Sequence, residues 1–312
     1  MNKPKVLVIA GPTGTGKTEL AIRVALAAHG EIVSADSMQV YKHMDIGTAK
    51  PALEERRGVP HHMIDVVDPG ESYSVARYIN EAQPVIINIL SRGKLPIIVG
   101  GTGLYIDSLL SGRTFIGKGA AKLRKSLESR YGEIGGEKML EELQSIDANK
   151  ANNLFPGDKK RIVRAIEAFY VSEGKTLSSH DEETKQNPPK YDHLKFILSY
   201  KDRAVLYDAI NRRVDSMISK GLEKEVSALI DMGVSQENTS MQAIGYKEIL
   251  DVVTCGAPLD IAIDKIKMES RRYAKRQLTW FRRDTEAKWI IWEDSPDYDS
   301  AVKQITRTLY EA

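Results

Sequence analysis

The sequence predicts an α/β fold in which a parallel-sheet core is interrupted by a helical insertion. Two features predict this fold. Near the N-terminus, short apolar runs typical of strands alternate with runs of helical spacing, the pattern of βα units in an open, doubly wound sheet. From about residue 113 to residue 190, by contrast, the chain consists of charged, amphipathic, helix-like segments. We therefore expect a core made of residues 1–112 and 191–312, and an insertion domain made of residues 113–190.

The N-terminal part of the core is expected to alternate strand and helix. KVLVIA is a short apolar run, and KTELAIRVALAAH has helical apolar spacing without a breaker. LPIIVG is apolar and β-branched, as expected of a buried central parallel strand. Pro84 is expected to bend or split the second helix. The expected strands are 5–10, 31–35, 63–67 and 95–100, and the expected helices are 17–29 and 74–93.

The rest of the chain is expected to be mostly helical. In the insertion, helices are predicted at 122–132, 137–147 and 159–174, followed by a polar, proline-containing loop at 180–191. The apolar run LKFILSY is predicted to return the chain to the sheet as a strand, 194–200. The C-terminal third is predicted to contain helices 203–232, 241–254, 259–281 and 297–310, with one short strand at 288–293.

Residues 11–18, GPTGTGKT, match the phosphate-binding pattern G-x-x-x-x-G-K-[ST] at every fixed position. The motif lies between a strand-like and a helix-like run, which is the context that this pattern requires. Glycines let successive backbone N–H groups face one anion, and the helix N-terminus adds partial positive charge. Lys17 is expected to reach the terminal phosphates, and the Thr18 hydroxyl to ligate Mg²⁺. The motif predicts a phosphate-loop NTPase-like core and a diphosphate or triphosphate ligand, without specifying which ligand. Its residues are Gly11, Pro12, Thr13, Gly14, Thr15, Gly16, Lys17 and Thr18.

Two more polar residues, Asp36 and Thr102, follow predicted strands and should meet the phosphate loop, because the carboxyl ends of parallel strands share one crevice. Asp36 has two functional interpretations, a magnesium ligand or a general base, and a structural one, a turn or helix-capping residue. The strand 95–100 ends in Gly-Gly-Thr rather than in the acidic residue usual in phosphate-loop hydrolases. This weakens an ATPase interpretation, although Asp68 could supply the carboxylate.

His61 and His62 are adjacent, and neighbouring side chains of an extended chain point in opposite directions. We therefore favour a packed or hydrogen-bonding pair over a metal site.

The stretch from 265 to 283 carries eight Lys or Arg residues and one Glu, with Tyr273, Trp280 and Phe281 interleaved. One interpretation is a solvated helix whose aromatic side chains face the core. The other is an RNA surface, which needs phosphate contacts and stacking groups. A second basic segment, KKRIVR at 159–164, lies in the predicted insertion.

Composition limits the protein class. The chain has 312 residues, 42% apolar content and a net charge of +2, so any nucleic-acid surface must be local. Cys255 is the only cysteine, which excludes an internal disulfide and a cysteine zinc cluster. We see no signal sequence and no apolar run of membrane-spanning length. We expect a cytoplasmic protein without membrane contact, acting as a monomer.

Seven segments together resemble the bacterial tRNA dimethylallyltransferases, also called tRNA isopentenyltransferases. They follow in order along nearly the whole chain, and the last two are specific to that family, whereas the phosphate loop alone is not. They are GPTGTGKT, SADSMQVYKHMDIGTAKP, GVPHHMIDVVDP, VGGTGLY, RIVRAIE, SMQAIGYKE and RRYAKRQLTWFRR. The resemblance implies transfer of a dimethylallyl group from dimethylallyl diphosphate to the exocyclic amine of the adenosine 3′ of the anticodon, giving isopentenyladenosine. It also implies a Mg²⁺ requirement and a helical insertion domain.

The resemblance also implies roles for individual residues. Residues 13–18 would bind the prenyl diphosphate, Asp36 would act as general base, and Thr102 would touch the same site. Many relatives have Gln-Arg where this chain has Lys160-Arg161, which retains the basic character but not the amide. The residues expected to meet the anticodon stem-loop of tRNA are Asp36, Ser37, Met38, Gln39, Thr102, Lys160, Arg161, Arg164, Gln242, Gly245, Tyr246, Lys247, Arg271, Arg272, Lys275 and Arg276.

Two competing hypotheses account for part of the sequence. A small-molecule phosphotransferase, or a prenyltransferase acting on free adenine nucleotides, would use the phosphate loop and Asp36 but not the basic helix or the insertion. A switch-like RNA-binding nucleotide protein would use the basic helix but has no role for Asp36 and Thr102.

Overall fold

The computed structural model describes residues 5–117 and 121–311. The chain forms two compact units, one made of Met1–Leu110 with Tyr191–Ala312 and the other of Ser111–Lys190. These boundaries lie within two residues of those expected from the change in sequence pattern. We call the first unit the core and the second the insertion. Residues 118–120 of the expected insertion lie outside the described residues.

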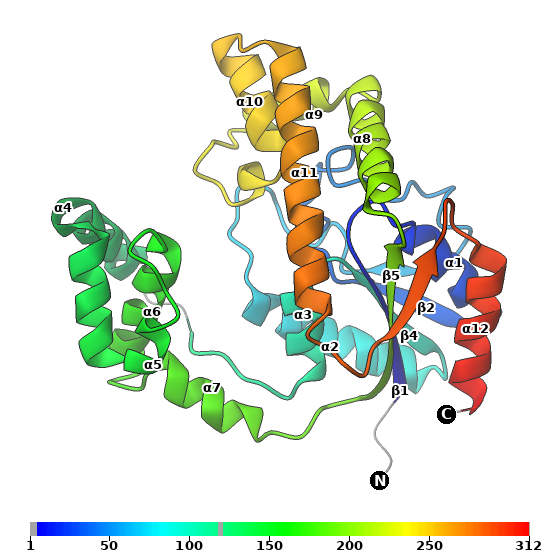
Figure 1. Cartoon of the computed structure of the whole chain (residues 1–312), viewed down its shortest axis with the longest axis horizontal. Helices are drawn as coiled ribbons and strands as arrows, with labels where there is room; N and C mark the ends of the chain where they lie inside the picture. The colour runs from blue at the N-terminus through cyan, green and yellow to red at the C-terminus, as the bar shows by residue number, and fades with distance from the viewer. Residues whose placement is uncertain (1–4, 118–120, 312) are drawn as a thin grey trace. The chain divides into compact units, whose positions relative to one another are not determined.

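The core contains a six-stranded sheet in the order β3-β2-β4-β1-β5-β6, with every pairing parallel (Figure 1). The order places β1, β2 and β4 side by side, so the loops after these strands emerge at one edge. The strands are β1 (Lys5–Ala10), β2 (Gly30–Ser34), β3 (His61–His62), β4 (Leu95–Gly100), β5 (Asp192–Tyr200) and β6 (Lys288–Trp292). The α/β class and the doubly wound arrangement predicted from the sequence are thereby confirmed.

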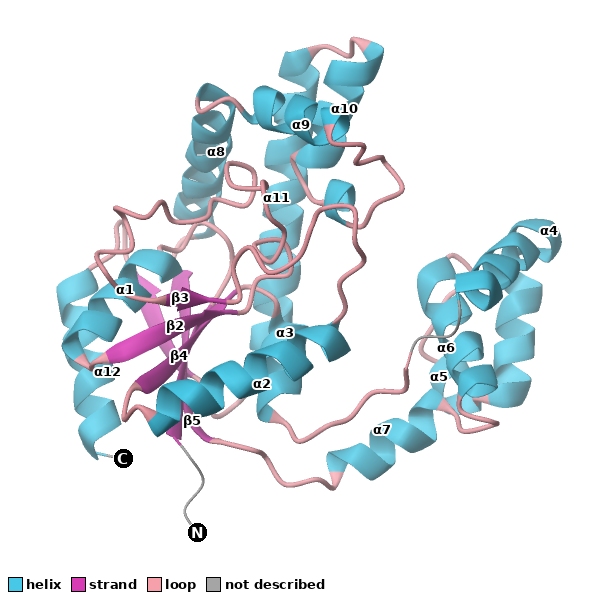
Figure 2. Ribbon diagram, turned by 180° about the vertical axis from the view of Figure 1, so that it is seen from behind, coloured by secondary structure: helices cyan, strands magenta, loops and turns pink. Residues whose placement is uncertain are grey.

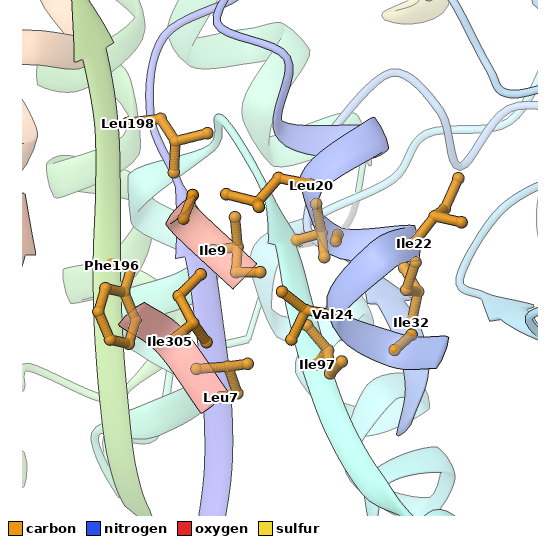
Figure 3. Packing of buried hydrophobic residues seen from close by; sticks show 14 of the residues in the cluster. Leu7, Ile9, Leu20, Ile22, Val24, Ile32, Ile97, Phe196, Leu198 and Ile305 are labelled. Carbon is orange, nitrogen blue, oxygen red and sulfur yellow. The ribbon is translucent and has the colours of Figure 1, made fainter. Parts of the chain in front are cut away.

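Helices cover both faces of the sheet (Figure 2). One face packs against α1 (Lys17–Ala27) and α12 (Tyr298–Glu311), where Ile9, Ile97 and Phe196 meet Leu20, Val24 and Ile305 (Figure 3). Helices α2 (Val75–Ser91) and α3 (Gly103–Leu110) lie on the other face (Figure 2). Because strand side chains alternate, the consecutive apolar residues 6–10 of β1 fill both layers.

The C-terminal helices stand beyond the carboxyl edge of the sheet, with α8 beside α11 (Figure 1). The single helix expected over 203–232 is instead two, because Gly221 adopts a left-handed conformation with φ of 96°. The segment expected as helix 241–254 begins as a short 3₁₀ turn, since Gly245 has φ of 98°. The bounds are α8 (Arg203–Ser219), α9 (Leu222–Asp231), η1 (Ser240–Gln242), α10 (Tyr246–Cys255) and α11 (Leu259–Phe281).

The insertion is helical and has its own apolar core, formed by residues such as Leu127, Met139, Leu143, Ile162 and Ile166. Its helices are α4 (Ala121–Ile146), α5 (Ala148–Ala151), α6 (Lys159–Val171) and α7 (Leu177–Lys185). The predicted break between its first two helices is present at Gly135, which has φ of 84°. The predicted loop at 180–191 is wrong in its first half, because α7 extends to Lys185 from a cap at Thr176. Only Thr184 of α7 is buried, so the helix has no apolar stripe to reveal it.

Two other expectations fail in the core. The strand expected at 63–67 does not form, since Met63 and Asp65 have positive φ and only Val67 makes a bridge, to Tyr41. Pro84 neither splits nor ends α2, which runs through it with Tyr78, Ala82 and Ile86 buried. Packing of this apolar face therefore outweighs the lost backbone hydrogen bond. Within the described residues, no helix has the length and apolar character needed to cross a bilayer.

Candidate active site

The phosphate loop joins β1 to α1 in a conformation that requires its glycines. Gly11 and Gly16 have φ of 145° and 76°, and a Cβ on Gly11 would collide with the backbone of Leu198 on β5. Within the loop, the Thr15 hydroxyl donates to the Pro12 carbonyl at 2.9 Å. The Trp292 indole N–H donates to the Thr15 carbonyl at 3.0 Å, so the last strand of the sheet also holds the loop.

A cavity of about 360 Å³ lies at the carboxyl edge of the sheet, next to this loop. Of the loop residues, Thr13, Lys17 and Thr18 line it, whereas Gly11, Pro12, Gly14, Thr15 and Gly16 shape the loop behind it. Residues 36–39 and 47–49 form another part of the wall. Helices α8 and α11 form the remainder together with residues 99–101 and 242–244. The structure therefore brings the phosphate loop and Asp36 together, as the sequence predicted, and adds part of the basic helix, which the sequence had not placed there.

Two half-buried cations, Lys17 and Arg213, share the cavity wall with Asp36. Burial lowers the pKa of Lys17 to about 7; the charge of Arg213 lowers it further, and Asp36 opposes the shift. Burial also lowers the pKa of Arg213, again opposed by Asp36. The Lys17 ammonium donates to the Pro12 carbonyl at 2.7 Å. Two confined positive charges beside one carboxylate leave the site in need of a further anion, which is the charge that a diphosphate supplies.

Sequence reasoning missed Arg213. It lies on α8 among Ile210, Val214 and Met217, which also line the cavity. The available signal was a cation on the apolar stripe of an amphipathic helix, where side chains three and four residues apart share a face.

Asp36 sits in a compact turn after β2. One of its carboxylate oxygens accepts the Met38 N–H at 2.9 Å and the Gln39 N–H at 3.4 Å. This is the turn role considered from the sequence, and the carboxyl group lines the cavity as well. Thr102 anchors the same turn, because its hydroxyl oxygen accepts the Ser37 N–H at 3.1 Å. Thr102 thus contacts the turn that carries Asp36, rather than the cavity itself.

Gln277 on α11 links two of the loops at the sheet edge. Its carbonyl oxygen accepts the Thr13 N–H at 3.0 Å, and its amide donates to the Gly101 carbonyl at 2.9 Å. Gln277 is buried, and Tyr273, one turn earlier on the same helix, lines the same cavity. The sequence placed these residues on the basic helix but did not assign them to the site. One N–H of the phosphate loop is therefore bound to α11 instead of facing the cavity.

The 240–248 motif contributes less surface than expected. Tyr246 is fully buried, its hydroxyl donates to Glu225 at 2.5 Å, and its ring packs against Gly47. Glu225 in turn accepts the N–H groups of Asp45, Ile46 and Gly47. The prediction that Tyr246 contacts tRNA is thus wrong for this structure, because its ring and hydroxyl are used to hold the 45–47 loop.

Its neighbours in the motif divide between surface and interior. Gln242 is exposed and lines the cavity, and Lys247 is exposed. Gly245 is buried, and its N–H is bound to Glu248 at 2.9 Å.

The basic helix α11 has features of both interpretations considered from the sequence. It carries exposed cations, and it also has aromatic side chains that face the core. Arg272 and Lys275 are exposed, and Arg276 is exposed at the cavity, 5.7 Å from the Tyr273 ring centre. Arg271 instead donates to Asn211 on α8 at 2.7 Å. Phe281 is buried, and the Trp280 N–H donates to Asp107 at 2.7 Å. The aromatic residues other than Tyr273 therefore pack inward, as the structural interpretation expected.

In the insertion, Lys160 and Arg161 are exposed, whereas Arg164 is only partly exposed. Its guanidinium donates to the carbonyls of Ile116 and Gly117 and pairs with buried Glu167 at 2.7 Å. The expected contact between Arg164 and tRNA is corrected accordingly, because its donors are used inside the insertion.

The structure also decides the histidine pair. His61 bonds the Val59 carbonyl at 2.8 Å, and His62 bonds Glu31 at 2.8 Å. Among the described residues, no three His, Cys, Asp or Glu side chains gather as metal ligands. The hydrogen-bonding interpretation of His61 and His62 is therefore confirmed.

A parallel sheet with a phosphate loop at its carboxyl edge, and a cavity that combines cations with a carboxylate, defines a phosphate-loop enzyme that binds a phosphorylated substrate. Comparison with known proteins identifies the group. The model of the IPP transferase family matches residues 39–284, and that of isopentenyl transferases matches residues 4–66. The chain belongs to the IPP transferase family.

Named relatives agree with this assignment. The tRNA dimethylallyltransferase of Acetivibrio thermocellus is 47% identical over 306 residues, 98% of this chain and 96% of that protein. That of Carboxydothermus hydrogenoformans is 49% identical over 287 residues, 92% of this chain and 91% of that protein.

Solved structures resemble the chain along its length. A tRNA isopentenylpyrophosphate transferase from Staphylococcus epidermidis has a TM-score of 0.73 and 41% identity, with 99% of each chain covered. A eukaryotic dimethylallyltransferase acting on tRNA has a TM-score of 0.83 and 32% identity, covering 97% of this chain and 77% of that one.

Proposed function

We propose that this chain is a tRNA dimethylallyltransferase. It transfers the dimethylallyl group of dimethylallyl diphosphate to the exocyclic amine of the adenosine 3′ of the anticodon, which gives isopentenyladenosine. Beyond family membership, one observation supports this most: a phosphate loop, an arginine and a carboxylate line a single cavity. The C1–O bond of the prenyl group breaks, a C–N bond forms, diphosphate leaves, and the amine loses one proton.

The leaving diphosphate needs positive groups already in place. We assign this role to Lys17, Arg213 and those phosphate-loop N–H groups that are not bound elsewhere, since Thr13 N–H is held by Gln277. Charge on the departing oxygens grows in the transition state, so fixed donors in a confined site stabilise it more than they stabilise the bound substrate. Neither cation has to move into place from bulk water during the reaction, because both already line the cavity.

Asp36 is proposed as the general base. The adenine amine is a poor nucleophile because its lone pair is conjugated with the ring, so removal of its proton as the C–N bond forms lowers the barrier. The turn bonds from Met38 and Gln39 orient the carboxylate, and Thr102 holds the turn through Ser37. The negative charge of Asp36 also favours the cationic character that develops on the allylic carbon.

Mg²⁺ fits the oxygen donors present. The Thr18 hydroxyl lines the cavity, and no three acidic or histidine side chains gather there as ligands among the described residues. Mg²⁺ usually keeps several waters and takes substrate phosphate oxygens beside one or two protein ligands, so a sparse donor set suits it. When bound, it would neutralise charge on the diphosphate.

The tRNA-binding surface is proposed to include the exposed cations of both units. In the core these cations are Arg272, Lys275, Arg276 and Lys247, and the surface there also includes the Gln242 amide. In the insertion the cations are Lys160 and Arg161. Such side chains give affinity through phosphate contacts, while the cavity accepts the target base, which has to leave the anticodon-loop stack to enter it. The monomeric, cytoplasmic state expected from the sequence stays a prediction.

One assay tests the proposal against both alternatives. Purified protein is incubated with labelled dimethylallyl diphosphate and unmodified tRNA, with AMP as the control acceptor and ATP hydrolysis measured in parallel. Label should enter tRNA, at an adenosine 3′ of the anticodon, and not AMP. Label transferred to AMP instead would indicate the small-molecule enzyme, and brisk ATP hydrolysis without prenyl transfer would indicate the switch protein.

A further inference from the structure

Phe155 of the insertion is a large apolar residue that is 78% exposed to solvent. It lies in the segment between α5 and α6, next to Leu154, which is buried in the apolar core of the insertion. The backbone therefore directs one residue inward and the next outward. Phe155 belongs neither to the phosphate loop nor to the cavity of the core.

The backbone around Phe155 is held in place. Its N–H donates to the Asp158 carboxylate at 2.9 Å, and its carbonyl accepts the Asp158 N–H at 2.9 Å. The carbonyl of Pro156 accepts the Tyr131 hydroxyl, and Gly136 packs so close to that carbonyl that a Cβ would collide with it. These contacts fix the turn to α4. Binding of a ligand to the aromatic ring therefore costs little backbone conformational entropy in the turn.

Cations follow this turn directly. Lys160 and Arg161 lie on the first turn of α6, both exposed, with 72% of the Arg161 side chain in solvent. Asp158 accepts the Phe155 N–H and lies 4.0 Å from the exposed Arg161 guanidinium, and the Lys159 ammonium lies 5.3 Å from the Tyr131 ring centre. An exposed aromatic ring beside two outward cations matches an unpaired nucleotide, whose base can stack on the ring while neighbouring phosphates meet the cations. A purely apolar protein partner would not need the charges.

We propose that Phe155 is a base-stacking residue that holds one unpaired nucleotide of the tRNA acceptor, with Lys160 and Arg161 contacting the adjacent phosphates. The inference rests on the proposed function, because it takes RNA to be the acceptor. It assigns two separable contributions. The ring supplies affinity that is independent of salt, and the two cations supply affinity that falls as salt rises.

Affinity for an anticodon stem-loop, measured by fluorescence anisotropy at several salt concentrations, separates these contributions. Phe155→Ala should weaken binding by about 5- to 150-fold, the effect of losing one stacked base, with an unchanged salt slope. Phe155→Trp should retain wild-type affinity. The double variant Lys160→Gln with Arg161→Gln should instead lower the slope by up to about two units. Tyr310→Ala is the matched control, since Tyr310 is 73% exposed in the core, and it should change neither quantity.

The stacked nucleotide is then located with stem-loops that each carry one abasic position. At one position the abasic RNA should bind wild-type protein as weakly as intact RNA binds Phe155→Ala, and the variant should lose nothing further there. Wild-type affinity of Phe155→Ala would overturn the proposal and leave the ring to a protein partner. A loss that persists at every abasic position would also overturn it. Failure of the proposed function is separate, because wild-type protein would then not prenylate tRNA at all.

Discussion

The cavity wall of the core and the outward faces of α11 and α6 both carry cations, but in opposite physical settings. In the cavity wall, Lys17 and Arg213 are half-buried and share the wall with Asp36, and the Lys17 pKa is lowered to about 7. On the outer faces, Arg272, Lys275 and Arg161 stand in solvent. A buried charge in a confined site acts strongly on a nearby reacting group, whereas an exposed charge is screened by water and salt.

The difference separates catalysis from affinity. Changes in the cavity wall should alter the rate of the chemical step, and changes on the outer faces should alter tRNA binding and its salt dependence. Helix α11 belongs to both regions, because Gln277 faces the phosphate loop and Lys275 faces solvent.

The largest effect is expected at Asp36. Asp36→Asn keeps the shape of the side chain but cannot accept the proton, so single-turnover prenylation should slow by about 10²- to 10⁴-fold. The affinity for tRNA should change little, since the outer cations are untouched. Asp208→Asn, an exposed carboxylate on α8, is the control and should behave as wild type. A near-normal single-turnover rate for Asp36→Asn would refute its role as base.

The two cations of the cavity wall come next. Lys17→Ala and Arg213→Leu should each lower the rate of the chemical step by about 10²- to 10³-fold, the usual effect of losing one donor to a developing negative charge. Arg212→Leu changes the adjacent, exposed arginine of the same helix and should have little effect. Equal losses for Arg212→Leu and Arg213→Leu, with both proteins folded, would remove Arg213 from the site.

Gln277 tests the connection between the two regions. Gln277→Leu fills similar space but frees the Thr13 N–H and the Gly101 carbonyl, so the loop is no longer held by α11. A loop displaced by about 1 Å can cost around 10²-fold in rate, and we expect a kcat about 10- to 100-fold lower with KM for tRNA nearly unchanged. Gln277→Glu still accepts from Thr13, and it should recover part of the rate. A change confined to KM for tRNA would make Gln277 a binding residue only.

The lowered pKa of Lys17 predicts a pH dependence. A diphosphate binds the charged ammonium, and a pKa of about 7 means that the free protein loses this charge as pH rises above neutrality. Binding must then restore the proton, so affinity for a non-reactive prenyl diphosphate analogue should fall by up to about tenfold per pH unit above pH 7. Calorimetry between pH 7 and 9 measures this, and Lys17→Arg should flatten the profile. A flat wild-type profile would contradict the lowered pKa.

The smallest effect is expected on the outer face of α11. Replacing Arg272 and Lys275 by Gln should weaken tRNA binding and reduce its log–log salt slope by up to about two units, with kcat at saturating tRNA unchanged. Lys303→Gln with Arg307→Gln removes the same charge from α12 and serves as control. If both pairs give the same slope as wild type, the α11 cations are a solvated surface.

Agreement between sequence and structure is closest where the signal is local. GPTGTGKT defines its own loop, and the apolar run at 95–100 matches β4 at both ends. Expectations failed where local signals were weak or overridden. The polar α7 has no apolar stripe, the backbone at Met63 and Asp65 turns away from an extended form, and packing carries α2 through Pro84.

The sequence by itself determined the phosphate loop, the strands that flank it, the position of Asp36 after β2 and the presence of a basic helix, because each depends on neighbouring residues. Only the tertiary structure decided which distant side chains complete the site. Gln277 meets Thr13 across 264 positions of sequence, and Arg213 reaches the cavity from α8. It also turned Tyr246 toward the carboxylate of Glu225 and Arg164 toward that of buried Glu167. The physical reason is that burial and hydrogen-bond partners are set by packing between elements, which a local pattern does not encode.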